Sequence, residues 1–505
     1  MKIFSSKQIR QWDTFTIANE PIASIDLMER AATACFNWLL ENNFVHRPIH
    51  IFCGKGNNGG DGLALARLLQ SHQYNTMVYV LESDSNGSAN FETNLARLTQ
   101  AHLIIHEIAS IQDFPSLTNA DIIIDALFGT GLNKPPEGIA VVTINFIAES
   151  VATVIAIDIP SGMYADKSSF LNTVVVASYT LSFQQYKLAF LMPENEAYFG
   201  EVNVLDIALH KQYAVDESAI FEMVNKEMIS QIYRPRNQFA HKGTYGHALL
   251  YAGSKGMMGA AVLTAKACLR SGVGLLTMAV PEAGCNILQT AVPEAMCITD
   301  SDEKFMEYCW HKKAVIGIGP GWGTGTAAVE VIDNIIEKWK GNLVMDAAAL
   351  QYLALYPAKQ QLLIPNTILT PHPKEFDRCF GESDNDFERV ELAMQKAAEL
   401  KIYIILKGHH TLIATPEGKG YFNNTGNAGM AKGGSGDVLT GIITGLLSQS
   451  YNPLQACMLG VYLHGLAGDI AAEKFSQEAM QASDIIENLG AAFKVIEKST
   501  LYVIA

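Results

Sequence analysis

Short apolar runs alternate with helical stretches from residue 48 onward. A run at 48–53 (PIHIFC) is followed by an expected helix over 63–72, and further strand-like runs lie at 76–81, 121–125 and 153–158. This alternation is typical of a mostly parallel sheet with helices on both faces. The preceding segment, 5–40, has helical periodicity and is expected to cap the sheet or form an interface. The pattern predicts an N-terminal α/β domain.

A second series of strands and helices begins near residue 247. Its expected strands are 247–251, 275–280, 314–318, 342–345, 367–369 and 402–406. Between the two series, 209–238 is a polar helical stretch that contains proline and is interpreted as a linker. Since 505 residues are too many for one ordinary core, we expect two α/β domains, 1–221 and 222–505.

The charge balance narrows the class of ligand. Lys and Arg number 36 against 51 Asp and Glu, a net charge of −15, and no Lys/Arg cluster interrupts the acidic background, so we expect no nucleic-acid partner. Small phosphorylated ligands remain possible, because backbone N–H groups can hold phosphate. The eight cysteines are scattered without a C-x-x-C pair, which argues against a zinc site or a disulfide framework. No run is long and apolar enough for a membrane span or a signal peptide, so we expect a cytoplasmic protein without a membrane partner.

The first glycine-rich loop, Gly54–Gly62 (GKGNNGGDG), lies between an expected strand and an expected helix. Its G-x-G-x-x-G spacing, with Glu82 further on, resembles a dinucleotide-binding turn. That motif alone is weak evidence for a nucleotide site, because a tight structural turn also explains it. The alternative that the protein is an NAD-dependent dehydrogenase has no support in the sequence other than this motif. The polar oxygens of Asn57, Asn58 and Asp61 exceed what a turn requires and favour a ligand site.

Two more loops follow strands that end in aspartate. These are Asp125–Leu132 (DALFGTGL) and Asp158–Gly162 (DIPSG). Helix capping could explain one such aspartate. Because ligands bind at the carboxyl ends of parallel strands, we expect all three loops to converge on one site.

The three motifs together resemble those of the NAD(P)H-hydrate epimerase family (the YjeF N-terminal domain), over about residues 1–215. The resemblance implies a Rossmann-like fold and a potassium ion held by Asn58, Asp125 and Ser161, whose oxygens are hard ligands. It implies that the hydrate is bound by Asn57, Asn58, Gly59, Gly60, Asp61, Gly129, Thr130, Gly131, Leu132, Asn133, Lys134, Pro135 and Asp158. Epimerisation at C6 needs a group that moves a proton, and Asp158 is our candidate catalytic residue. Lys55 stands where the family often has proline, and we expect it to contribute only backbone.

The second glycine-rich loop, Thr425–Asp437 (TGNAGMAKGGSGD), precedes an apolar helix expected over 438–447. Its glycines leave N–H groups open at a helix N-terminus, where the helix dipole favours phosphate. A carboxylate beside phosphate is unfavourable unless it acts as a base or binds a metal. Asp437 is therefore a candidate base, although a helix-capping aspartate after a flexible loop is the simpler alternative.

This loop resembles the G-x-G-D anion hole of ribokinase-like proteins. Together with Gly317–Thr324, Thr370–Phe376, Lys407–Thr411 and His464–Asp469, it resembles the ADP-dependent NAD(P)H-hydrate dehydratase family over about residues 235–500. The resemblance implies a hydrate site of Gly321, Gly323, His372, Pro373, Lys374, Glu375, Phe376, Asp377, Arg378 and Asp437. It implies an ADP site of Lys407, Gly408, His409, His410, Thr411, Asn427, Ala428, Gly429, Met430, Ala431, Lys432, Gly433, Gly434, Ser435 and Gly436, with Mg²⁺ accompanying the nucleotide.

Several residues depart from the family or have a simpler explanation. Lys374 stands where the family commonly has glycine, and Ala348 replaces a second carboxylate, which puts a metal-binding role of that segment in doubt. By default His372 is a turn histidine, and His464, in an apolar helix, is a satisfied core histidine. We expect His409 and its neighbour His410 to face solvent.

The combined prediction is a bifunctional enzyme. It epimerises R and S NADHX or NADPHX and then dehydrates the S form at the expense of ADP. One alternative is a small-molecule kinase of ribokinase type, and another is a non-catalytic N-terminal binding domain. Both halves resemble self-associating domains, so we expect a homo-oligomer, a tetramer or larger.

Overall fold

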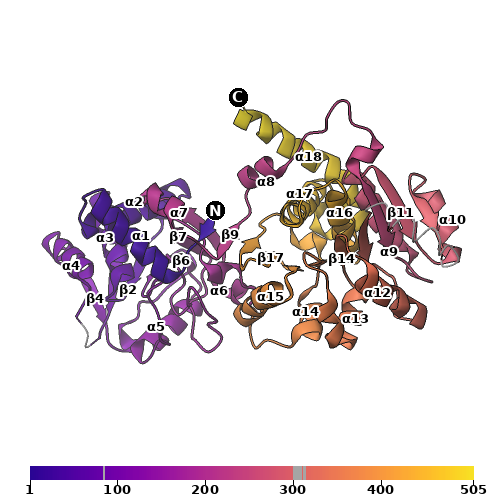
Figure 1. The fold of residues 1–505 in the computed structure, drawn as a ribbon. Helices are drawn as coiled ribbons and strands as arrows, with labels where there is room; N and C mark the ends of the chain where they lie inside the picture. Colours follow the sequence, from indigo (N-terminus) through magenta and orange to yellow (C-terminus); the bar gives the residue numbers. More distant parts are fainter. Residues whose placement is uncertain (84–85, 300–309, 311–313, 505) are drawn as a thin grey trace. The chain divides into compact units, whose positions relative to one another are not determined.

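The computed structural model describes residues 1–83, 86–299, 310 and 314–504. The chain forms two compact units (Figure 1). The N-terminal unit comprises Lys2–Ile220 with Asn385–Phe387. The C-terminal unit comprises Met1, Phe221–Asp384 and Glu388–Ala505.

The N-terminal unit is built on a parallel sheet in the order β4-β3-β2-β5-β6-β7-β8. Its strands are β2 (Ile49–Cys53), β3 (Thr76–Leu81), β4 (Ile105–Ile108), β5 (Ile122–Ala126), β6 (Thr153–Ile157), β7 (Tyr179–Phe183) and β8 (Glu201–Leu205). The chain runs outward from β2 to β4, then returns to β5 on the other side of β2 and runs outward again. In such sheets the crevice between the two central strands is the usual ligand site.

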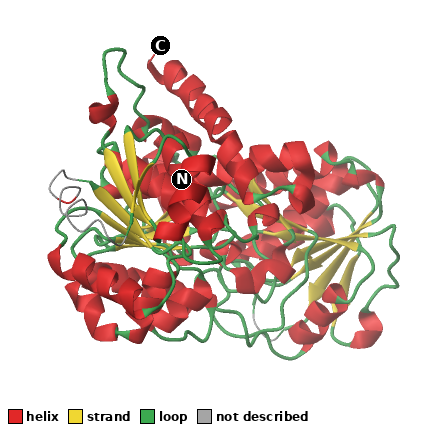
Figure 2. Ribbon diagram, turned by 90° about the vertical axis from the view of Figure 1, so that its right-hand side faces the viewer, coloured by secondary structure: helices red, strands yellow, loops and turns green. Residues whose placement is uncertain are grey.

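Helices pack around the strands throughout the structure (Figure 2), and apolar residues of helices form a core on each face of this sheet. The helices of this unit are α1 (Ser6–Asn19), α2 (Ser24–Glu41), α3 (Asn57–Ser71), α4 (Ala89–Gln100), α5 (Ile139–Ala148), α6 (Glu196–Phe199) and α7 (Lys211–Asp216), with the short strand β1 (Lys2–Ile3). On β2, Ile49 and Ile51 join the core under α2 and α3, whereas Phe52 joins the core under α5. Successive side chains point to opposite faces, so burial on both faces explains the continuous apolar run of this strand.

The C-terminal unit contains a larger mixed sheet in the order β9-β18-β17-β16-β15-β14-β13-β10-β11-β12. Its strands are β9 (Phe221–Met223), β10 (His247–Tyr251), β11 (Leu275–Ala279), β12 (Met296–Ile298), β13 (Val315–Ile318), β14 (Leu343–Met345), β15 (Ile368–Leu369), β16 (Tyr403–Leu406), β17 (Leu412–Ala414) and β18 (Gly420–Phe422). All of these pairs are parallel except those made by β17 with β16 and with β18. The α/β prediction is confirmed for both units, and every predicted strand is present with its ends displaced by no more than one residue.

The helices of the C-terminal unit pack against this sheet and against one another. They are α8 (Lys226–Ile232), α9 (Met258–Arg270), α10 (Glu282–Ala291), α12 (Thr326–Lys338), α13 (Ala348–Leu355), α14 (Pro373–Phe380), α15 (Asp386–Leu400), α16 (Ser435–Ser448), α17 (Pro453–Ala479) and α18 (Ala482–Ile504). Residues of α16, α17 and α18 form one large core cluster with the strands. Helix α16 is buried along almost its whole length, which explains its apolar sequence.

Two predictions about individual segments are wrong. The stretch 209–238 is not a continuous helical linker: it contains α7, the strand β9 and α8. The compact units change over between Ile220 and Phe221. The helix expected over 63–72 begins earlier, at Asn57, so the second half of the first glycine loop forms the opening turns of α3.

Candidate functional site

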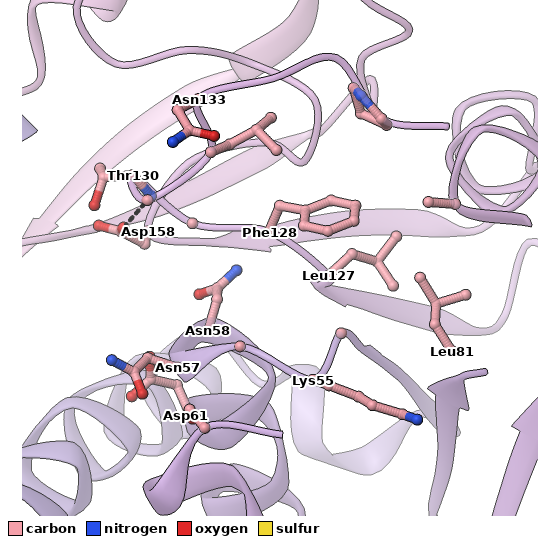
Figure 3. Close-up of a pocket in the computed structure, with 18 of the residues that line it drawn as sticks. Lys55, Asn57, Asn58, Asp61, Leu81, Leu127, Phe128, Thr130, Asn133 and Asp158 are labelled. Carbon is pink, nitrogen blue, oxygen red and sulfur yellow. Dashed lines mark hydrogen bonds between the residues drawn. The ribbon is translucent and has the colours of Figure 1, made fainter. Parts of the chain in front are cut away.

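A pocket of about 820 Å³ opens at the carboxyl ends of the strands of the N-terminal unit. Loops that follow β2, β5 and β6 line it, as the three motifs predicted. Figure 3 shows Asn57, Asn58 and Asp61 on one side of the pocket and Thr130, Asn133 and Asp158 on the other. The predicted residues that line it are Asn57, Asn58, Asp61, Gly129, Thr130, Gly131, Leu132, Asn133, Lys134, Pro135 and Asp158. Gly59, Gly60, Asp125 and Ser161 are buried and are not among the lining residues.

A close approach between two backbone segments explains Gly59. A Cβ atom at this position would lie 1.6 Å from the carbonyl oxygen of Gly54, which no side chain can occupy. The N-terminus of α3 is thereby held against the turn that follows β2. Its first N–H groups have no partner within the helix, so this end of the pocket suits an anion such as phosphate.

Polar groups are buried at the pocket wall and directly behind it. The side-chain oxygen and nitrogen of Asn58 have no hydrogen-bond partner in the part of the chain that the structure describes. The carboxylate of Asp125 accepts hydrogen bonds from the backbone N–H of Ser161 (2.7 Å) and from its hydroxyl (2.6 Å). Burial raises the pKa of Asp125 to about 6, although the Ser161 hydrogen bonds oppose the rise.

Asp158 is held at both carboxylate oxygens. It follows β6 with φ at +68°, which is uncommon for a residue other than glycine. Oδ2 accepts a hydrogen bond from the backbone N–H of Thr130 (3.1 Å), drawn in Figure 3, and Oδ1 forms an ion pair with Nζ of Lys187 (2.7 Å). The Lys187 side chain is only 1% exposed and also donates to the Ser182 hydroxyl and the Phe183 carbonyl.

Sequence reasoning missed Lys187. Its one sequence signal is its place shortly after β7, because strand ends meet at the site in a parallel sheet. It also misjudged Lys55: the side chain lines the pocket and Nζ donates to the carbonyl of Ser83 (2.6 Å), so this residue contributes more than backbone.

Two further carboxyl groups of the pocket have raised pKa values. Burial raises the pKa of Asp61 well above its ordinary value, and the charges of Asp158 and Asp13 add to the effect. Burial, followed by the charge of Asp158, raises the pKa of Asp13 to about 7, while Lys187 opposes the rise. Asp13 lies on α1 and belonged to none of the motifs.

In the C-terminal unit, the second glycine loop leads into α16, which begins at Ser435. Gly434 precedes it with φ at +96°, a conformation that favours glycine. A Cβ atom on Gly436 would lie 3.3 Å from Nζ of Lys407 and 3.6 Å from Oδ2 of Asp346. The loop, Lys407 and Asp346 are therefore neighbours at the carboxyl ends of the strands.

Lys407 connects the acidic groups of this site. Its Nζ lies 3.1 Å from Oδ1 of Asp346 and 3.7 Å from Oε2 of Glu375, while Thr440 donates to Oδ2 of Asp346 (2.9 Å). Burial raises the pKa of Asp437 to about 6, Asp346 adds to the rise, and Lys407 opposes it. Asp437 is thus mainly ionised at neutral pH and placed beside an anion-binding loop, which suits a general base.

Sequence reasoning gave no role to two aspartates of this unit. Asp346 directly follows β14, just as Asp158 directly follows β6. Asp469 accepts hydrogen bonds from the N–H of Gly426 and the side-chain amide of Asn427, both at 2.9 Å, and so fixes the glycine loop to α17.

Several predicted ligand residues have structural partners. His372 caps α14, with Nδ1 accepting from the N–H of Glu375 (3.2 Å). Asp377 is paired with Arg389 (2.9 Å), and Phe376 is fully buried. The Lys432 ammonium donates to the carbonyl groups of Met480 and Glu478.

His410 is half-buried and so less exposed than expected: its Nδ1 has no hydrogen-bond partner in the described chain, and burial lowers the pKa of the ring to about 4. His464 lies within α17, where burial lowers its pKa to about 4, and its Nε2 has no hydrogen-bond partner among the described residues. His409 is exposed as expected.

Comparisons with known proteins agree with this division of the chain. One family model, described as YjeF-related protein N-terminus, matches residues 24–189, and a second, described as NAD(P)H-hydrate dehydratase, matches residues 248–490. The bifunctional NAD(P)H-hydrate repair enzyme Nnr of Moorella thermoacetica is 32% identical over 535 residues, covering 100% of this chain and 99% of that protein. The chain belongs to this family of bifunctional NAD(P)H-hydrate repair enzymes.

Other relatives extend the match. The Nnr enzyme of Escherichia coli K12 is 33% identical over 473 residues, covering 92% of this chain and 88% of that protein. A solved ribokinase-like superfamily protein from Enterococcus faecalis V583 is 27% identical, covers 55% of this chain and 98% of that chain, and has a TM-score of 0.50. The predicted ribokinase-like fold of the C-terminal unit is confirmed.

Among the described residues, no helix combines the length and the apolar character needed to cross a membrane.

Proposed function

We propose that the N-terminal unit interconverts the R and S forms of NAD(P)H hydrate and that the C-terminal unit dehydrates the S form with ADP, giving NAD(P)H, AMP and phosphate. Membership of the repair family over the full chain supports both activities. The observation that carries the proposal is the position of Asp437. It is a carboxylate of raised pKa at the start of α16, beside a glycine loop, Lys407 and Asp346.

In the dehydratase reaction, Asp437 takes the proton of the C6 hydroxyl. The hydroxyl oxygen then bonds to the terminal phosphorus of ADP, and AMP leaves. The ring nitrogen lone pair next expels the phosphate from C6, and loss of a ring proton restores the reduced nicotinamide. Lys407 and the backbone N–H groups of Gly433, Gly434 and Gly436 stabilise the charge on the transferring phosphoryl group.

A magnesium ion would accompany the nucleotide at this site. The carboxylate oxygens of Asp346 and Glu375 beside Lys407 are hard ligands of the kind that Mg²⁺ prefers. When bound, the ion would neutralise phosphate charge. The chain itself positions the phosphates with Lys407 and the glycine loop.

In the epimerase reaction, Asp158 is the proposed catalytic carboxylate. Lys187 and the Thr130 N–H hold both of its oxygens, so it faces the pocket in one orientation. We assign the phosphates of the hydrate to the segments Asn57–Asp61 and Gly129–Pro135, most of whose residues border the same pocket. At the start of α3 the first N–H groups have no partner within the helix and can bind an anion.

A potassium ion fits the polar groups at the wall of this pocket and behind it. The unpartnered Asn58 side chain is a buried group in need of a ligand, and Asp125 is a fully buried carboxylate that forms no ion pair with a Lys or Arg of the described chain. Asn58, Asp125 and Ser161 would hold the ion, which would supply positive charge close to the bound phosphates.

Two broader properties stay predictions. Both units resemble self-associating domains, so we propose a homo-oligomer of four or more chains, which a measurement of mass in solution would test. The described cysteines are unpaired and mostly buried, which fits a reducing compartment such as the cytoplasm.

The dehydratase proposal is tested with purified S hydrate and ADP. The wild-type protein should restore the absorbance of reduced nicotinamide, and Asp437→Asn should lose this activity while still epimerising the hydrate. A wild-type protein that consumes ADP without restoring NADH would refute the proposal and would favour a kinase.

A further inference from the structure

Helix α1 is firmly attached to the N-terminal unit, although it lies before residue 24, where the first family model begins to match. Trp12 stacks on Tyr213 and meets Phe4 edge-on. The indole N–H of Trp12 donates to the carbonyl of His210 (2.9 Å), and the His210 N–H donates to the Thr16 hydroxyl (3.0 Å). These contacts fix the rotation of α1 about its axis.

The face of α1 that this packing leaves free borders the pocket. Ile9, Arg10 and Asp13 all line it. Residues four apart lie on the same side of a helix, so Ile9 and Asp13 share one face. Asp13 is therefore a polar group that the fold holds in the proposed epimerase site, and the function described above does not use it.

Asp13 interacts electrostatically with charged groups from three other elements. These are Asp61 on α3, Asp158 after β6 and Lys187 after β7. The other charged residues that line the pocket are Arg10, Lys55, Glu82, Lys134 and Glu137. The buried ammonium of Lys187 is committed to Asp158. In the described chain neither Asp13 nor Asp61 forms a salt bridge.

Carboxyl groups of like charge that lie close together in a half-buried pocket disfavour one another's ionisation, so such a cluster tends to retain protons. Asp158 has a cation and a backbone N–H on its oxygens and is the member best stabilised as an anion. Burial and the charges of Asp158 and Asp13 raise the pKa of Asp61 well above its ordinary value, whereas the pKa of Asp13 is raised to about 7. A group with a pKa near the working pH is the most effective proton donor and acceptor.

We propose that Asp13 is a further catalytic residue of the N-terminal site, which protonates the departing C6 hydroxyl and takes the proton back when water returns. This role rests on the proposed epimerase function. The proton of the Asp13 carboxyl moves to the hydroxyl oxygen, the C6–O bond breaks and water leaves. The ring nitrogen lone pair forms a double bond to C6, and the resulting cation faces the carboxylate of Asp158.

The reverse steps complete the cycle. Water attacks C6 from the opposite face, the nitrogen recovers its lone pair, and the proton released by the attacking water returns to Asp13. The configuration at C6 is inverted and nothing is consumed. Asp158, clamped by Lys187, stabilises the cation, while Asp13 carries the proton.

The test uses the full chain and its own dehydratase unit. With R hydrate and ADP, the appearance of NADH requires epimerisation, whereas S hydrate needs only the dehydratase. The variant is Asp13→Asn, and the matched control is Thr14→Asn, which changes the exposed neighbouring position on α1. The rates are measured across pH with each hydrate separately.

We expect Asp13→Asn to lower kcat for R hydrate by about 100-fold or more, with KM changed less than about threefold, and to remove the inflection near pH 7. Asp13→Glu should restore part of the rate together with the inflection. Thr14→Asn should match the wild type, and all variants should convert S hydrate normally. In labelled water without ADP, the wild type should exchange the C6 oxygen and Asp13→Asn should not.

Three results would overturn the assignment. They are a variant kcat within about threefold of the wild type, a loss that leaves the inflection in place, and the absence of oxygen exchange in a wild type that epimerises. A wild type that converts S hydrate but never R hydrate would instead refute the epimerase proposal, and the role of Asp13 would fall with it.

Discussion

The turn at Gly59 gives a sharp test of how the N-terminal pocket is built. In Gly59→Ala, the new Cβ would lie 1.6 Å from the Gly54 carbonyl oxygen, and real Cβ contacts essentially never fall under 3.0 Å. One backbone segment must therefore move by at least about 1.4 Å. Gly54 cannot yield easily, because its N–H donates to the carbonyl of Ala126 (3.1 Å) and it lies so close to the Leu127 carbonyl that a Cβ on Gly54 itself would be 2.1 Å from that oxygen.

The displacement falls on the start of α3, which carries Asn57, Asn58 and Asp61. A misplacement of about 1 Å in a catalytic site can cost 100-fold in rate, and overpacking of this kind destabilises by about 3 kcal/mol. For a unit of this size that corresponds to a fall in Tm of about 6–12 °C. We expect Gly59→Ala to lose at least about 100-fold in epimerisation of R hydrate while S-hydrate dehydration is kept.

Gly56→Ala is the matched control. A Cβ at Gly56 meets nothing within 4 Å and its φ is −83°, so this variant should retain near wild-type epimerisation and Tm. Both rates come from the NADH signal with each hydrate, and Tm comes from calorimetry. A Gly59→Ala protein with normal epimerisation and a normal Tm would refute the reasoning about the turn.

The other predictions concern the phosphate loop, the base and the cation. Gly434→Ala should abolish ADP-dependent dehydration, because a side chain at φ +96° costs about 1–2 kcal/mol and a leucine methyl lies 2.7 Å from the new Cβ. The control Gly433→Ala should stay active, because a Cβ there meets nothing within 4 Å. Equal dehydration rates for the two variants would contradict this prediction. The kcat for S hydrate should fall as pH drops through about 6, because Asp437 then becomes protonated and can no longer accept a proton. Asp346→Asn should move this fall in kcat to lower pH, because the charge of Asp346 raises the pKa of Asp437. A fall at the same pH in the variant would contradict this interaction between the two carboxylates. Replacing K⁺ by tetramethylammonium should lower the Tm of the N-terminal unit. If K⁺ is present at 100 times its Kd, its loss would lower the free energy of unfolding by up to about 2.7 kcal/mol. An unchanged Tm would argue against the cation beside Asp125.

The strands were predictable because burial on both faces of a parallel sheet requires continuous apolar runs, as at Ile49–Cys53. The strand β9 (Phe221–Met223) was missed because three residues with an acidic centre carry no such signal. The start of α3 was misplaced because Asn and Gly have low helix propensity, and the contact of Gly59 with Gly54 overrides that preference.

The loops of both sites were predictable, since strand-end glycines and aspartates must meet at one edge of a parallel sheet. The residues that contact the aspartates of these loops could not be predicted. Lys187 lies 29 positions from Asp158, and only the folded chain brings the two together. Asp346 was visible at a strand end, but its contact with Lys407 depends on the order of β14, β15 and β16.

The most direct test of the central claim is the conversion of a mixture of R and S hydrates in the presence of ADP. The two units acting in sequence predict that NADH rises to the full amount of hydrate supplied, faster than in an enzyme-free control. A yield that stops at the S fraction would contradict the epimerase half, and no NADH at all would contradict the account as a whole.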